Sequence, residues 1–143
     1  MSKINFDECL YFASARVNRI VAKISDDQFK KLGLSSTAAF ILMYLDTGDA
    51  INPSAIADEL SLDRSTVTRF LDKLQRQGYI ERTSQGRSVT VALTKAGLNL
   101  QTDLKQMWST LNDQYIELLG ADGEQTLRTL LNTDFGVLKA NNG

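Results

Sequence analysis

The residues best suited to chemistry lie in one segment, DRSTVTRFLDKLQRQG, which begins at Asp63. In a helix, its apolar side chains form a single stripe, made of Val67, Phe70, Leu71 and Leu74. The opposite face and its flanks carry hydroxyls and charges, from Ser65, Thr66, Thr68, Arg69, Asp72, Lys73 and Arg76. Small hydroxyl side chains let a helix approach base edges, arginine forks bind guanine or phosphate, and lysine binds phosphate. The segment therefore predicts a helix that reads a DNA major groove; a solvated helix face is the alternative if the helix is considered by itself.

The distribution of charge favours the DNA-binding interpretation. The whole chain has 16 Lys and Arg against 17 Asp and Glu, which gives a net charge of −1. Residues 64–87 carry six cations and two anions, a net charge of +4, so the remainder has a net charge of −5. Positive charge concentrated in one segment supplies phosphate contacts, although an acidic chain is not the usual composition of a DNA-binding protein.

Several classes of catalytic and metal site are excluded by the composition. The chain has no His and one Cys, so it cannot build Ser-His-Asp or Cys-His catalysis, or a His-ligated or CxxC metal site. The acidic pairs at 26–27 and 58–59 occupy adjacent helix positions, which do not face each other. No glycine-rich phosphate loop is present. We expect no enzyme, no cofactor and no metal.

The location of the protein is expected to be the cytoplasm. No apolar run approaches the roughly 18 residues that a membrane span needs. The start, MSKINFDECLYF, lacks the basic region and apolar stretch of a signal peptide. The single Cys fits a reducing compartment.

The elements that must position this segment follow from periodicity and end signals. Apolar residues at helical spacing predict helices over 7–31, 36–45, 53–60, 64–77, 95–119 and 124–138. Asn5 with Glu8 resembles a capping box, and Ser35, Asn52, Asp63 and Thr94 are expected N-caps. Alternating apolar residues predict strands over 79–83 and 88–93, joined by a hairpin loop at 84–87.

The order of these elements predicts a mainly α fold built on a winged helix-turn-helix. The short helix and the helix beginning at residue 64 form the helix-turn-helix, and the small β-hairpin forms the wing. Residues 34–94 are expected to bind DNA. Residues 1–33 and 95–143 are expected to form long terminal helices outside that unit, intertwined with the DNA-binding region in one domain.

Two stretches of sequence carry a resemblance to a known family. They are SAIADELSLDRSTVTRFLDKLQRQGYIER over 54–82 and VALTKAG over 91–97. Together they resemble the MarR (multiple antibiotic resistance) family of transcriptional regulators, and CLYFASARVNRIVAKI over 9–24 is similar to that family's first helix. The resemblance implies a homodimer held together by the terminal helices.

The resemblance also implies which residues meet DNA. Pro53 and Ser54 open the supporting helix. The implied DNA contacts are Ser54, Arg64, Ser65, Thr66, Thr68, Arg69, Lys73, Arg76 and Arg87. Gln85 and Gly86 stand where the family often has an acidic and a basic residue, and the wing is a few residues shorter than usual. Arg87, at the wing tip, is therefore expected either to reach the minor groove or to contact only the backbone.

Two kinds of release are implied by the same resemblance. A small-molecule effector would bind in a cleft lined by Arg16, Tyr44, Trp108 and Tyr115. Alternatively, Cys9 would be oxidised, as in peroxide-sensing members of the family. The competing interpretations are core packing of the aromatic residues, a surface position for Arg16, and a Cys9 that is a small hydrophobic residue buried at the dimer interface.

The functional prediction is a homodimeric, sequence-specific regulator of transcription that binds double-stranded DNA at a pseudo-palindromic operator. It is expected to be a repressor released by an unidentified small molecule or by a redox change. The alternative is a winged-helix protein-interaction module without specific DNA binding.

Overall fold

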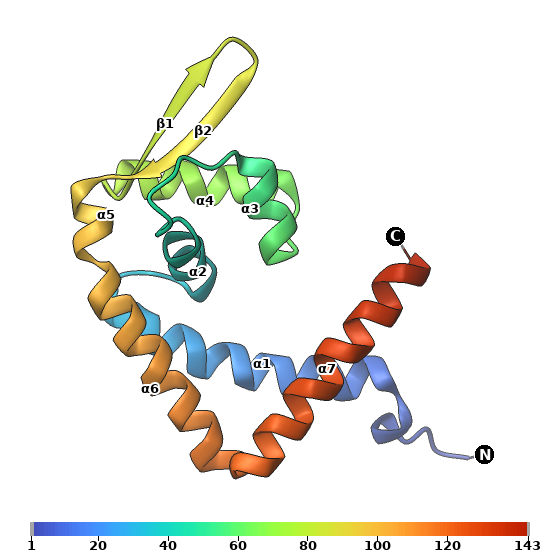
Figure 1. Cartoon of the computed structure of the whole chain (residues 1–143). Helices are drawn as coiled ribbons and strands as arrows, with labels where there is room; N and C mark the ends of the chain where they lie inside the picture. The colour runs from blue at the N-terminus through green and yellow to red at the C-terminus, as the bar shows by residue number, and fades with distance from the viewer. Residues whose placement is uncertain (1, 143) are drawn as a thin grey trace. The chain divides into compact units, whose positions relative to one another are not determined.

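The computed structural model describes residues 2–142, which form two compact units divided between Met107 and Trp108. The first unit contains the terminal helix α1 (Leu10–Phe29), the helices α2 (Ser36–Tyr44), α3 (Pro53–Leu60) and α4 (Arg64–Arg76), the hairpin β1–β2 (Ile80–Gln85, Ser88–Leu93) and α5 (Lys95–Asn99). The helix α6 (Gln101–Leu119) begins in this unit, and α7 (Ala121–Asn142) belongs to the second (Figure 1). The predicted mainly α fold with a small hairpin is confirmed.

The first predicted helix is interrupted near its start. A 3-10 helix covers Phe6–Glu8, and Cys9, with extended backbone (φ −102°, ψ 119°), separates it from α1. The Asn5 side chain accepts a hydrogen bond from the Asp7 amide, so Asn5 caps the 3-10 helix and not a continuous α-helix. The predicted capping box was therefore wrong. At the other end, a 3-10 turn over Lys30–Leu32 leads to Gly33, whose φ of 72° lets the chain turn away.

The helix-turn-helix forms from the expected end signals. The Asn52 side chain caps α3 by accepting from the Ala55 amide at 2.9 Å, and Pro53 occupies the first helical position. Ser35 caps α2 in the same way through the Ala38 amide. Asp63 is the N-cap residue of α4 by position but makes no capping hydrogen bond. Ser61 ends α3 in the left-handed conformation, with φ 54°.

The core of the first unit fixes the orientation of α4. Helix α2 packs against α1, α3 and α4. The fully buried side chains include Phe29, Ile41, Leu42, Ile56, Val67, Leu71 and Leu74. Because three of these residues come from the apolar stripe of α4, its polar face must point outward.

The wing is a two-stranded antiparallel hairpin with a tighter turn than predicted. Pairing runs from Ile80–Leu93 to Gln85–Ser88, so only Gly86 and Arg87 form the turn. Gly86 has φ 61°, which suits the first position of a two-residue hairpin turn. The predicted four-residue loop was wrong because this turn lets pairing continue for two more residues of β1.

The hairpin is anchored at its base. Val91 is fully buried and pairs with Ile51 through two backbone hydrogen bonds of 2.7 and 2.9 Å. Strand β1 contacts α4, and β2 contacts α3 and α5.

The predicted single helix 95–119 is divided into α5 and α6. The side-chain Nε2 of Gln101 donates to the Gly97 carbonyl, at 3.2 Å, and to the Leu42 carbonyl, at 2.9 Å. The chain bends at Leu100, which lies between the two helices. Farther on, Gly120 alone, with φ 79°, separates α6 from α7, so α7 starts three residues earlier than predicted.

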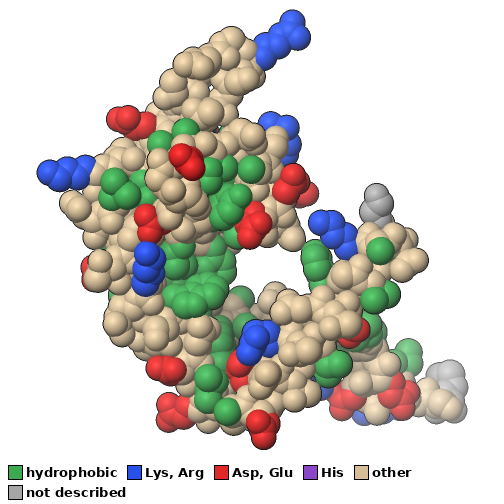
Figure 2. Space-filling view, viewed as in Figure 1, with side chains coloured by type: hydrophobic (Ala, Val, Ile, Leu, Met, Phe, Trp, Pro, Cys, Tyr) green, Lys and Arg blue, Asp and Glu red, His purple; other side chains and the backbone are tan. Residues whose placement is uncertain are grey.

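Helix α7 has no buried residue among the residues described, and its apolar side chains lie on the surface (Figure 2). Within residues 2–142, no helix combines the length and apolar character needed to cross a membrane.

Candidate nucleic-acid interface

The polar face of α4 is presented to solvent. Its exposed residues are Arg64, Ser65, Thr68, Arg69, Lys73 and Arg76, and Thr66 and Asp72 are partly exposed. The buried side chains of Val67, Leu71 and Leu74 on the opposite side of α4 hold this face outward. The face therefore has the length, the hydroxyls and the cations that a major-groove helix needs.

Two hydrogen bonds order the first turns of α4. The Thr68 hydroxyl donates to the Arg64 carbonyl at 3.0 Å, which turns the hydroxyl back along the helix. The Arg69 Nη2 donates to the Thr66 hydroxyl at 3.3 Å. Arg69 is thus oriented along the helix in the free protein and keeps four further N–H donors for DNA.

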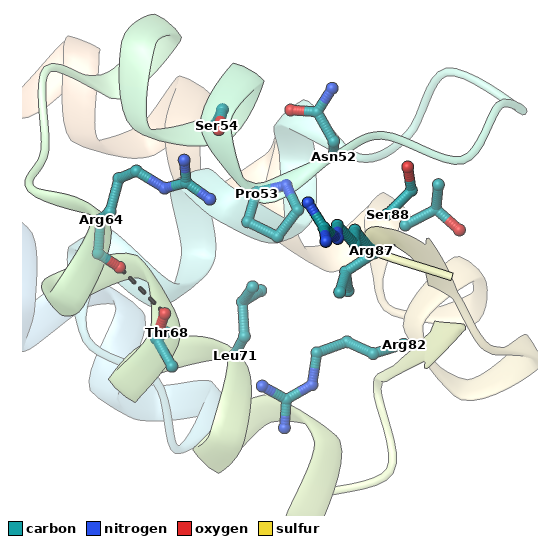
Figure 3. A pocket seen from close by; sticks show the side chains of 11 residues that line it. Asn52, Pro53, Ser54, Arg64, Thr68, Leu71, Arg82, Arg87 and Ser88 are labelled. Atoms are coloured by element: carbon teal, nitrogen blue, oxygen red, sulfur yellow. Dashed lines mark hydrogen bonds between the residues drawn. The ribbon is translucent and has the colours of Figure 1, made fainter. Parts of the chain in front are cut away.

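A groove of about 600 Å3 separates the start of the helix-turn-helix from the wing (Figure 3). Four predicted DNA contacts line it, namely Ser54, Arg64, Thr68 and Arg87. Sequence reasoning missed the other polar residues of its lining, which are Asn52, Arg82, Ser88 and Thr90. The groove thus brings together residues from the start of α3, from α4, from both strands of the hairpin and from its turn.

The other predicted DNA contacts do not line this groove. Ser65, Thr66, Arg69, Lys73 and Arg76 lie on other parts of α4. Arg87, in the turn of the hairpin, does line it (Figure 3).

Arg82 of β1 is tied to α4. Its Nη2 lies 2.7 Å from Asp72 Oδ1, and its Nε donates to Gln75 Oε1 at 2.7 Å. Asp72 and Gln75 are three residues apart, so both project from one side of α4. The sequence indicated Arg82 only as one of the six cations of this segment.

The residues of the predicted effector cleft fall into different parts of the structure. Arg16 of α1 pairs with Asp7 at 3.0 Å and lies over the Phe12 ring, 4.8 Å from its centroid. These residues line a hollow of about 570 Å3 against the N-terminal segment. Tyr44 ends α2 in the first unit, and Trp108 and Tyr115 belong to the second unit. The cleft stays a prediction.

Cys9 is exposed in the single chain, so neither oxidation of Cys9 nor its burial at a dimer interface is tested by this position. It precedes α1 and makes no capping hydrogen bond through its side chain. Over residues 2–142, no cluster of three or more acidic, Cys or His side chains is arranged to hold a metal ion.

Comparison with known proteins agrees with this geometry. Residues 34–88 match the model of the MarR family. The HTH-type transcriptional regulator SarZ of Staphylococcus haemolyticus is 30% identical over 91 residues, which cover 62% of this chain and 59% of that protein. The chain thus spans about three fifths of that relative's length.

Two solved structures are similar over nearly the whole chain. The transcriptional repressor CouR bound to p-coumaroyl-CoA has a TM-score of 0.81 and 26% identity, with 93% of this chain and 96% of CouR covered. A mutant of MarR from Escherichia coli complexed with operator DNA has a TM-score of 0.78 and 25% identity, with 92% and 98% covered. The helix-turn-helix and wing of this chain thus match the MarR family of transcriptional regulators, and the fold of nearly the whole chain is similar to solved structures of transcriptional regulators, MarR among them.

Proposed function

We propose that this protein is a homodimeric regulator of transcription that binds double-stranded DNA in a sequence-specific manner. The observation that carries the proposal is the exposed polar face of α4, held outward by the buried Val67, Leu71 and Leu74. A protein-binding face would more often carry exposed apolar anchors, which this face lacks. The MarR relative is complexed with operator DNA, which supports the same use of the fold here.

In the proposed complex, α4 enters the major groove, where some of its polar residues contact base edges and others contact phosphates. Ser65, Thr66, Thr68 and Arg69 face base edges, and Arg69 is the side chain able to bind guanine with two hydrogen bonds. Arg64, Lys73 and Arg76 contact phosphates and fix the register. Ser54 meets the backbone at the start of α3, and Arg87 carries the contact of the wing.

The proposed dimer would join the terminal helices, within residues 1–33 and 95–143. Large apolar side chains of α1 are exposed, including Leu10 at 77% and Ile20 at 64%. Helix α7 adds Leu130, Leu131, Phe135 and Leu138, which are 50–61% exposed. Exposed apolar residues at this density are typical of an interface. Two recognition helices would then read half-sites about 10 base pairs apart on a pseudo-palindrome.

Release from DNA is proposed to follow binding of a small molecule or oxidation of Cys9. The relative CouR is a repressor bound to p-coumaroyl-CoA, which supports repression lifted by a ligand. Arg16, Tyr44, Trp108 and Tyr115 remain the proposed lining of the effector cleft. A coupling of about 1–3 kcal/mol between the two sites is enough for such release. Because the protein must reach DNA, the proposed location is the cytoplasm.

The deciding experiment is fluorescence anisotropy with a labelled duplex from the region upstream of the protein's own gene, compared with a scrambled duplex over a series of salt concentrations. The proposal predicts selective binding that weakens steeply with salt, by about 0.9 log units per log unit of salt for each phosphate neutralised. Competition with genomic fragments tests for an operator elsewhere. Equal, weak binding to all duplexes would instead favour the protein-interaction module.

The dimer is tested separately by sedimentation equilibrium. The wild-type protein is expected at twice the 15.9 kDa chain mass. Phe135→Asp places a charge on the exposed apolar side of α7 and should shift the protein toward the monomer. A monomeric wild type at micromolar concentration would refute the dimer without touching the proposal for α4.

A further inference from the structure

The outer half of the wing, residues 83–90, contains no buried residue, and only Val89 and Thr90 in it are partly buried. Thr83, Ser84 and Gln85 of β1 are exposed, as are Arg87 and Ser88 beyond them. A two-stranded ribbon by itself is only marginally stable in water. Its attachment to the rest of the unit lies at its base, where Ile80 and Val91 are buried.

Arg82 is the outermost residue of β1 with a side-chain hydrogen bond to α4 among the residues described. It is half-buried, with 27% of its side chain exposed, and it lies opposite Val91 in the hairpin. Its Nη2 forms an ion pair with Asp72, and its Nε donates a hydrogen bond to Gln75. Two nitrogens of one guanidinium thus contact two acceptors on one side of α4. A planar fork held at two points resists rotation, as a single ion pair does not.

We propose that Arg82 is a positioning residue that fixes the angle between the wing and the recognition helix α4. The proposal rests on the proposed DNA-binding function. Arg87 lies about 13 Å beyond Arg82 along the hairpin at roughly 3.3 Å per residue, so a rotation of about 10° at Arg82 displaces Arg87 by about 2.3 Å. Such a displacement exceeds the tolerance of a hydrogen bond to DNA. We call the contacts of Arg82 with Asp72 and Gln75 the brace. With the brace in place, Arg87 and the polar face of α4 meet DNA as one preorganised surface.

The competing role for Arg82 is a direct phosphate contact. Arg82 lines the groove between α4 and the wing, near Arg64 and Arg87 (Figure 3), where a phosphate could attract it. The geometry favours the brace because the guanidinium is already neutralised by Asp72 and partly removed from water. The two roles predict opposite effects when Asp72 is removed.

The test on DNA is a double-mutant cycle between Asp72→Ala and Arg87→Ala. If Arg82 positions the wing, Asp72→Ala weakens specific binding about 3–10-fold although it removes a negative charge. Arg87→Ala lowers the DNA affinity of the wild type about tenfold, and it should lower the affinity of the Asp72→Ala variant less than about threefold. If Arg82 contacts phosphate directly, Asp72→Ala strengthens binding and leaves the effect of Arg87→Ala unchanged. That outcome overturns the proposal.

The matched control is Glu81→Ala. Glu81 precedes Arg82 on β1, is exposed and makes no ion pair among the residues described. The substitution removes the same charge from the same basic segment, so it should strengthen binding slightly through long-range electrostatics and leave the Arg87→Ala effect intact. An equal loss of coupling in this variant would also overturn the brace.

A measurement without DNA separates this inference from the proposed function. In a Cys9→Ser background, a nitroxide attached to Ser84→Cys reports motion of the wing by electron paramagnetic resonance. Asp72→Ala and Gln75→Ala should each increase the mobility of the label, and Glu81→Ala should not. Unchanged mobility in both brace variants refutes the brace even if the wild type binds DNA. If the label becomes more mobile in the brace variants but the wild type binds DNA without selectivity, the brace is supported and the proposed function is refuted.

Discussion

Gly97→Ala should destabilise the protein, because the added methyl group has no space. A Cβ at Gly97 would lie 2.3 Å from the Tyr79 carbonyl oxygen and 3.1 Å from a Leu93 methyl carbon. The nearest permitted distance is about 3.0 Å, so the backbone of α5 or of the loop after α4 must move by about 0.7 Å. The same Tyr79 carbonyl accepts a hydrogen bond from the Thr94 amide at 3.0 Å, which this movement would weaken.

The magnitude follows from two opposing terms. Overpacking against a backbone atom costs about 1–3 kcal/mol, and a weakened backbone hydrogen bond adds roughly 0.5–1 kcal/mol. The greater helix propensity of alanine returns about 0.5–1 kcal/mol. We expect a net loss of about 1–3 kcal/mol, equivalent to a decrease in Tm of roughly 3–10 °C for a chain of this size.

The assay is thermal and urea unfolding followed by circular dichroism, at one fixed protein concentration because association contributes to stability. Gly123→Ala is the matched control, since its Cβ would meet only the Leu119 Cβ at 3.7 Å, an ordinary contact. That variant should be neutral or stabilised by up to about 1 kcal/mol. If Gly97→Ala proves as stable as Gly123→Ala, the close approach of α5 to the Tyr79 carbonyl is not a feature of the folded protein in solution.

Three further predictions concern DNA binding, backbone strain and pH. Arg69→Ala should weaken specific binding by about 1–3 kcal/mol in the anisotropy assay, and Arg69→Lys should lose selectivity but keep the salt slope; unchanged selectivity would remove Arg69 from the base contacts. Ser61→Gly should raise the urea unfolding free energy by up to about 1 kcal/mol, because glycine adopts the φ of 54° without the left-handed penalty; a loss of stability would contradict this. Hydrogen bonds from Arg128 lower the pKa of Glu124 below its ordinary 4.5. The ion pair between Glu124 and Arg128 therefore stabilises the folded protein above pH 4.5, and this stabilisation is lost as the pH falls through the lowered pKa. Glu124→Gln should therefore reduce Tm slightly at neutral pH and not in strong acid, and an equal reduction at both would refute the ion pair.

Elements set by local chemistry could be predicted from the sequence. Asn52 followed by Pro53 located the start of α3, and its bounds are as predicted. Of the four residues in the predicted apolar stripe of α4, Val67, Leu71 and Leu74 are buried and Phe70 is partly buried, since the spacing depends only on helix geometry. The polar residues opposite the stripe needed no further information to be placed on the outer face.

Elements that depend on distant contacts could not be predicted. Nothing next to Leu100 in the sequence ends a helix, and the bend there accompanies hydrogen bonds from the Gln101 side chain, one of them to Leu42 of α2, 59 residues away. The length of the hairpin depended on how many residues could pair before the Gly86 turn. Pairing continues to Gln85 and Ser88, so the loop has two residues and not the predicted four. Local signals fix where an element can start, and tertiary contacts decide where it stops.

Arg82 shows how the same distinction applies to the proposed site. Asp72 and Gln75 have helical spacing, so the sequence places them together on α4. Arg82 joins them only because β1 packs against α4, where Leu74 and Ile80 are buried. From the sequence, Arg82 is one of six cations that could contact DNA phosphates. Its ion pair with Asp72 makes it unavailable for such a contact. If Arg82 is the brace, the cations available to DNA on this segment number five and not six, and the steepness of the salt dependence will show the difference.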